Sequence, residues 1–166
     1  PDGSHDVPAD RVTHRNLLKQ SLDEIISHKV DPRFLQDTLE GKLYGRGTEA
    51  FVVGSNDFYL SYATKNGLLL TLDVGHYHPT ESVGDKISAI LPFVKGLVIH
   101  AGRSVRGDSD HVPTLLDETL VQIAEEAVRS GRLDKIYWQL CYGDSSINRI
   151  AAWVIGARAT QKSLLY

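Results

Sequence analysis

The chain has 166 residues, of which 42% are hydrophobic, and a formal net charge of -3 at pH 7. This length supports one sizeable hydrophobic core and favours a single domain over two. The small net charge and scattered histidines lack the clustered basic face that binds nucleic acid, and no apolar run approaches the roughly 18 to 20 residues that span a bilayer. We therefore expect neither a nucleic-acid partner nor a membrane segment.

The cysteine content and the two chain ends allow two further predictions, one about the cellular compartment and one about truncation. Cys141 is the only cysteine, so it cannot form an internal disulfide, which favours a reducing compartment with the cytoplasm as the default. The chain opens with the sequence PDGS, contains no methionine, and stops at residues 161–166 inside an apolar helical pattern. These features lead us to expect a chain truncated at both ends.

The first third of the chain predicts two helices and a strand. Apolar residues at helical spacing mark the first helix, namely Leu18, Leu22, Ile25 and Ile26. Asp31-Pro32 interrupts the pattern, residues 39–43 are compatible with a strand, and residues 55–65 with a helix. Asn66-Gly67 is expected to close that second helix.

Three apolar runs further along the chain predict strands at residues 68–74, 97–100 and 136–141. The first of these runs lacks alternation, which is typical of a strand buried on both faces of a parallel sheet. Amphipathic helical patterns follow at residues 83–94, 120–128 and 147–155. Glycines at positions 96 and 131 are expected to end the first two of these helices.

Strands that alternate with helices at intervals of about 30 residues predict an α/β fold with a parallel sheet. Periodicity alone leaves two architectures open, an open doubly wound sheet and a closed barrel. A complete (β/α)8 barrel needs about 200 to 250 residues, so this chain could supply about half of one.

Reactive side chains in parallel α/β folds gather where strands end and loops begin. The residues at those places are Glu40, Lys42, Asp73, His76, His78, His100, Asp108, Asp110, Cys141 and Asp144. All except Lys42 are potential metal ligands.

Each candidate also has an ordinary structural interpretation. Asp117 and Asp144 are typical helix N-caps, and we assign no chemistry to Asp117. His76 and His78 are too close in sequence for both to serve one ion, so we expect one ligand between them. His100 could be a core histidine. Asp73, in contrast, closes an apolar run and needs a cation to stabilise its charge.

The gathering of several potential ligands at one end of the sheet favours a metal site. Two carboxylates one residue apart, Asp108 and Asp110, can close around one cation if the loop brings them together. With Glu40, Asp73, His76 and His100 they come from successive units and are expected to face one rim. Carboxylates with imidazoles suit Mn, Co, Zn or Mg. Six ligands are enough for two neighbouring ions.

Seven long motifs span nearly the whole chain: PDGSHDVPADR, GKLYG, VGSNDFY, LTLDVGHYHPTE, DKISA, RSVRGDSDHVP and SINRIAAWVIG. In this order they resemble the central and C-terminal part of the barrel of L-rhamnose isomerases. The resemblance implies a single partial domain over residues 1–166, with about four to five consecutive strand–helix units of a (β/α)8 TIM-type barrel. It also implies a homotetramer in rhamnose metabolism that converts an aldose to its ketose with manganese.

The resemblance assigns a role to each candidate. His76, Asp108 and Asp110 would hold the catalytic ion, while the second, substrate-binding ion would be held by Glu40, Asp73 and His100. Lys42 would act near the sugar oxygens; its ordinary interpretation is a surface charge. The expected ions are Mn²⁺, with Zn²⁺ or Co²⁺ as alternatives, two per complete site.

The chain departs from the family's pattern at several positions. Cys141 stands where the family has an aspartate that completes the second ion's shell, and Asp144 matches a different aspartate. A thiol is a softer ligand with a higher pKa than a carboxylate, which would weaken Mn²⁺ binding or shift preference toward Zn²⁺. Gly107 and Gly143 replace aromatic residues, and the loss at Gly107 would open the sugar pocket. His5 replaces a lysine.

The resemblance implies hydride transfer between C1 and C2 of the open-chain sugar, and an ene-diol route with a carboxylate base is the rival. Two other functions stay open: a metal-dependent hydrolase on a similar barrel, and an inactive fragment. A half barrel exposes two sheet edges, which a second copy of the chain could cover.

Overall fold

The computed structural model describes residues 10–41, 55–78, 80–102, 114–140 and 147–166. In chain order the elements are α1 (Arg11–Ser27), β1 (Thr38–Glu40), α2 (Asn56–Asn66), β2 (Leu69–Asp73), α3 (Val83–Ile90), β3 (Gly96–His100), α4 (Glu118–Arg129), the 3-10 helix η2 (Leu133–Lys135), β4 (Ile136–Gln139) and α5 (Arg149–Leu164). None of the described helices is long and apolar enough to cross a membrane.

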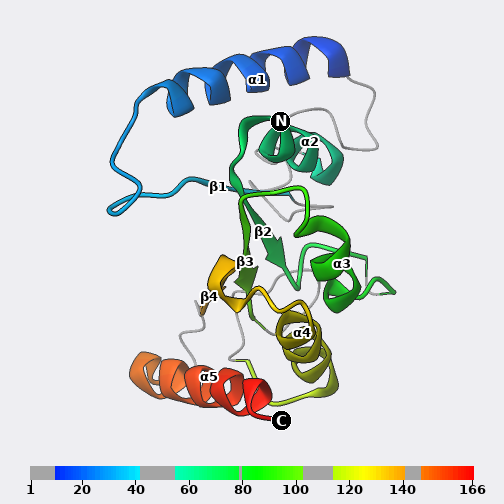
Figure 1. Cartoon of the computed structure of the whole chain (residues 1–166), viewed down its shortest axis with the longest axis vertical. Coiled ribbons are helices and arrows are strands. Elements are labelled where there is room, and N and C mark those ends of the chain that lie inside the picture. The colour runs from blue at the N-terminus through cyan, green and yellow to red at the C-terminus, as the bar shows by residue number, and fades with distance from the viewer. Residues whose placement is uncertain (1–9, 42–54, 79, 103–113, 141–146) are drawn as a thin grey trace.

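The four strands form one parallel sheet in the order β1-β2-β3-β4. A doubly wound sheet reverses its strand order at a switch point, whereas a barrel adds each strand beside the one before it. The predicted parallel α/β fold is therefore confirmed, and the sequential order is consistent with part of a (β/α)8 barrel. Helices α2, α3 and α4 follow one another along the sheet, with α5 against α4 (Figure 1).

The hydrophobic core lies between the sheet and these helices. Strands β2 and β3 are buried at every position. Leu70, Leu72, Leu97 and Ile99 pack into one apolar cluster with helix residues such as Ile87. Successive side chains of a strand point to opposite faces, so residues 71, 73 and 100 face away from this cluster. Burial on both faces explains why these strands are apolar without alternation.

Local capping chemistry sets the helix ends. Ser55, Ser82, Asp117 and Asn148 each accept a backbone N–H from the first turn of α2, α3, α4 and α5, respectively. The expected stop after α2 is confirmed, because Gly67 adopts a left-handed conformation there, with φ of 62°. Side chains and glycine thus satisfy backbone groups that a helix leaves unpaired.

Several predicted boundaries were wrong, among them Gly96, which was expected to end a helix and is instead the first residue of β3. The apolar stripe predicted one helix over residues 83–94, but α3 ends at Ile90 and turns follow it. Leu91 precedes Pro92, and a proline disfavours helical conformation in the residue before it, although Leu91 and Val94 still join the core. The strand predicted at residues 136–141 ends at Gln139; Cys141 lies outside the described residues.

Gly96 allows close packing of β3 against its neighbours, and Gly96→Ala should destabilise the fold. A methyl group there would lie 2.6 Å from the Lys135 carbonyl oxygen and 3.0 Å from Leu69 Cδ2. Overpacking of this kind costs about 1 to 3 kcal/mol of unfolding free energy, measurable by urea denaturation. Gly84→Ala is the control, because its methyl would come no closer than 3.3 Å to another atom. Equal stability of both variants would contradict this packing.

Candidate metal centre

Three neighbouring strands bring charged side chains to one edge of the sheet. Glu40, Asp73 and His100 are the last residues of β1, β2 and β3. In the parallel register Asp73 pairs with His100, and Glu40 pairs with Thr71. The Thr38 and Thr71 hydroxyls lie 2.8 Å apart, as expected for residues on the face opposite the apolar cluster. Register and alternation therefore direct all three charged groups to the same face.

His76, from the turn after β2, completes a four-residue cluster with Glu40, Asp73 and His100. His76 Nδ1 lies 2.9 Å from Glu40 Oε1, and His76 Nε2 lies 3.5 Å from Asp73 Oδ2. His100 Nδ1 lies 2.8 Å from Asp73 Oδ2 and 3.7 Å from Glu40 Oε1. Ligand atoms of Glu40, Asp73 and His76 all lie within 4.8 Å of one another. One ion could therefore contact several of them at once.

Three residues of the cluster are buried, whereas the Glu40 side chain is 32% exposed. Asp73 is 1% exposed, His100 5% and His76 8%. Asp73 Oδ1 accepts the Gly75 backbone N–H at 2.6 Å, which holds the turn that carries His76. Asp73 Oδ2 faces the two imidazoles. A buried carboxylate needs such partners because its charge would otherwise be strongly destabilised.

Charge interactions within the cluster shift two pKa values in opposite directions. Burial alone would raise the pKa of Glu40, but the neighbouring His100 and His76 imidazoles hold it well below its usual range. Burial alone would lower the pKa of His100, but Asp73 and Glu40 raise it to about 11. The two carboxylates thus create a strong demand for positive charge, which an imidazolium or a metal cation can meet.

The donor set fits a divalent cation. Both ring nitrogens of His76 are buried, and neither makes a hydrogen bond of good geometry with any described residue. His76 Nδ1 lies 2.9 Å from Glu40 Oε1, where a carboxylate and an imidazole could share one cation. Buried polar atoms normally have a partner. Two carboxylates with imidazoles are typical ligands of Mn²⁺, Co²⁺ or Zn²⁺.

Two other candidates have structural roles. His78 is exposed, and its Nδ1 lies 2.8 Å from the Thr80 hydroxyl, so it lies outside the cluster while His76 lies within it. Asp117 caps α4 by accepting the Leu120 N–H at 3.0 Å. The remaining candidates lie outside the described residues. They are the predicted ligands Asp108, Asp110 and Cys141, together with Lys42 and Asp144.

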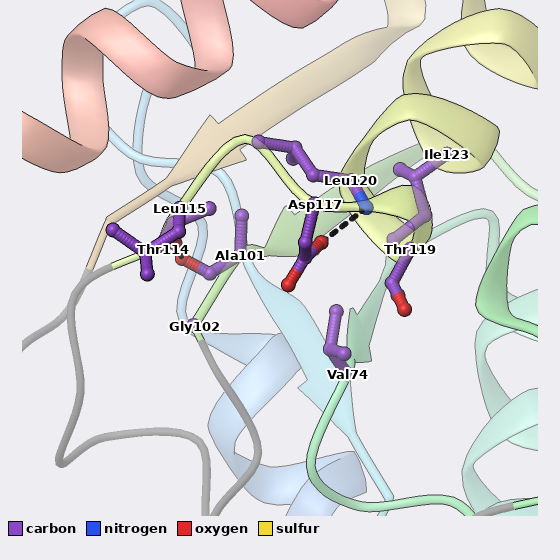
Figure 2. A pocket seen from close by; sticks show the side chains of 9 residues that line it. All are labelled: Val74, Ala101, Gly102, Thr114, Leu115, Asp117, Thr119, Leu120 and Ile123. Atoms are coloured by element: carbon purple, nitrogen blue, oxygen red, sulfur yellow. Dashed lines mark hydrogen bonds between the residues drawn. The ribbon is translucent and has the colours of Figure 1, made fainter.

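A cavity of about 190 Å³ lies at the start of α4, where Asp117 accepts the Leu120 N–H (Figure 2). Val74 and Ala101 line it, directly after Asp73 and His100, while no residue of the cluster does. Its other lining residues surround the start of α4: Gly102, Thr114, Leu115, Asp117, Thr119, Leu120 and Ile123.

Sequence reasoning missed the support around the cluster. Tyr77, which lies between His76 and His78 in the sequence, is buried. Its hydroxyl donates a hydrogen bond to Asn56 Oδ1 at 3.2 Å. Burial and the carboxylates of Glu81, Asp73 and Glu40 raise its pKa above the usual range, so it stays a hydrogen-bond donor. The position of Tyr77 directly after His76 was the sequence feature that could have indicated a supporting role. Its hydrogen-bond partner on α2 could not be predicted from the sequence.

The pKa of His100 predicts a pH-dependent contribution to stability. Its pKa rises from an ordinary value of 6.5 to about 11 on folding, so the imidazolium stabilises the fold fully below pH 6.5 and loses this effect as pH rises toward 11. With a chelator present, His100→Gln should reduce the unfolding free energy by about 3 kcal/mol at pH 6. The difference from the unaltered chain should shrink steadily as the pH is raised through 7 to 10.

Urea denaturation at each pH checks this expectation. The two chains should be compared only above pH 5. The pKa of Glu40 is lowered from 4.5, so the Glu40 carboxylate stays charged throughout this range. His78→Gln is the matched control, since His78 is exposed. A difference that is constant from pH 6 to 10 would count against the ion pairing of His100.

Comparison with known proteins agrees with the family that the sequence motifs resemble. A family model described as L-rhamnose isomerase (RhaA) matches residues 1–166. The L-rhamnose isomerase of Mannheimia succiniciproducens is 52% identical over 165 residues, covering 99% of this chain and 39% of that protein. Those of Salmonella paratyphi B and Salmonella newport are 50% identical with the same coverage. The chain thus spans about two fifths of the length of these relatives.

Proposed function

This chain belongs to the L-rhamnose isomerase family, and we propose on that basis that it carries much of the metal centre of an enzyme that interconverts L-rhamnose and L-rhamnulose. The observation that carries the proposal is the four-residue cluster of Glu40, Asp73, His76 and His100 at the carboxyl edge of the sheet. Active sites of (β/α)8 barrels lie at this edge.

We propose that the complete site holds two divalent ions, with Mn²⁺ preferred. Glu40, Asp73 and His100 would hold the substrate-binding ion, and His76 would hold the catalytic ion together with Asp108 and Asp110. The contact of His76 with Glu40 and Asp73 supports ions that are close neighbours. Bound ions would supply Lewis acidity, which polarises a sugar carbonyl and acidifies a hydroxyl or water.

The chain's own residues would hold and orient the sugar. The buried carboxylate of Asp73 and the partly exposed carboxylate of Glu40 would keep the site attractive to cations. Lys42 would lie near the sugar oxygens, and Cys141 would replace a carboxylate ligand with a softer thiol. In the proposed reaction, hydrogen moves with its electron pair from C2 of the aldose to C1, while a proton moves from O2 to O1.

The proposal extends to the whole protein. Residues 1–166 would form one part of a single (β/α)8 barrel domain, and the enzyme would assemble as a homotetramer in the cytoplasm. Family membership over the full length of this chain supports these points.

Metal binding can be tested by Mn²⁺ titration followed by electron paramagnetic resonance. Loss of a residue that only hydrogen-bonds to a metal ligand typically lowers metal affinity by roughly 10- to 100-fold. Loss of a ligand itself should cost more, so Glu40→Gln or Asp73→Asn should weaken Mn²⁺ binding by about 100-fold or more. His78→Gln is the control and should bind as the unaltered chain does, because His78 lies outside the cluster. Cys141→Asp should strengthen binding of Mn²⁺. Equal affinity in all four variants would reject this ligand set.

The reaction can be tested with L-rhamnose that carries deuterium at C2. In the presence of Mn²⁺, we expect the label to be retained at C1 of the ketose, because the hydrogen moves directly between the two carbons. Mass spectrometry of the product measures the retention. Complete loss of the label to solvent would favour the ene-diol route, and hydrolysis of amides or esters without sugar isomerisation would favour a hydrolase.

A further inference from the structure

The turn that carries His76 is tied to α2 by the next residue. Tyr77 is 8% exposed, and its hydroxyl donates a hydrogen bond to Asn56 Oδ1 at 3.2 Å. Asn56 is the first residue of α2. The hydrogen bond therefore links the segment after β2 to the start of a helix that precedes β2 in the chain.

Asn56 in turn lies directly against the strand end that carries Glu40. Gly41 follows Glu40, and a methyl group on Gly41 would lie 2.8 Å from Asn56 Cα and 3.2 Å from Asn56 Oδ1. Such a distance to a backbone atom leaves no space for a side chain. The backbone after Glu40 and the first turn of α2 are thus packed as closely as a glycine permits.

The Tyr77 ring is also held from the side of α3. The Lys86 ammonium lies 4.5 Å from the ring centroid, within the range of a cation–π interaction. Glu81 accepts a hydrogen bond from the same ammonium. Because the ring and its hydroxyl both have partners, Tyr77 has little freedom to rotate away from Asn56.

We propose that Tyr77 and Asn56 are positioning residues that set the separation of two metal ligands, His76 and Glu40. The connection runs from His76 through Tyr77 to Asn56, and from Asn56 through Gly41 to Glu40. This connection lies outside the cluster and joins the two residues whose side chains meet within it, where His76 Nδ1 lies 2.9 Å from Glu40 Oε1. This inference rests on the proposed metal centre and assigns a function to residues beyond the ligands.

The expected effect is moderate, because neither residue contacts the ion. A neutral hydrogen bond of this kind corresponds to roughly a two- to tenfold change in an equilibrium constant. Tyr77→Phe and Asn56→Ala should each weaken Mn²⁺ binding by about that factor. The double variant should bind about as weakly as either single variant, since both substitutions remove the same contact.

The test is a Mn²⁺ titration of the whole chain by electron paramagnetic resonance, with affinity and spectral line shape as readouts. The line shape reports ligand geometry, so a shifted ligand changes it even at saturation. Tyr62→Phe is the matched control, because it removes a 2.7 Å hydroxyl bond from the same helix to Asp23 on α1. It should lower stability without changing affinity or line shape.

Three outcomes decide the inference. Weaker binding and an altered spectrum in Tyr77→Phe, with Tyr62→Phe unchanged, would support it. Unchanged binding and spectrum in Tyr77→Phe and Asn56→Ala, alongside loss of binding in Glu40→Gln, would overturn the positioning role and leave the metal centre intact. Absence of Mn²⁺ binding in the unaltered chain would overturn the metal centre and the positioning role together.

Discussion

Parallel pairing in a fixed register is the constraint on which the site depends. Because β2 and β3 pair with Asp73 beside His100, and side chains alternate between faces, the charged residues cannot turn toward the apolar cluster of Leu70 and Leu72. A one-residue slip would exchange the two faces and bury the charges among leucines. The hydrophobic packing that fixes this register therefore also places the candidate ligands.

The same arrangement explains the electrostatics of the cluster. Strands buried on both faces leave little water to solvate Asp73, so its charge must be balanced by neighbours. His76 and His100 supply that balance at distances of 3.5 and 2.8 Å. A site that attracts protons this strongly is also suited to a divalent cation, because metal ions compete with protons for the same atoms. Stability and the proposed metal binding thus depend on one group of residues.

Much of the fold could be predicted from residue patterns, because apolar runs and capping residues act locally. The runs at β2 and β3 and the left-handed Gly67 after α2 are found where the patterns indicate them. The end of α3 was missed because the apolar stripe continues beyond Pro92, and core packing of Leu91 does not require helix. The contact of Tyr77 with Asn56 was missed because it joins separate elements.

The sequence by itself determined the parallel α/β class, the residue types that could bind a metal, and membership of a family, since each is written in local pattern or in motif order. Tertiary structure alone decided which candidates meet. It brought Glu40, Asp73, His76 and His100 together and left His78 at the surface beside Thr80. Spacing along the chain cannot distinguish these cases, because strand register and turn geometry, which depend on long-range packing, decide where each side chain points.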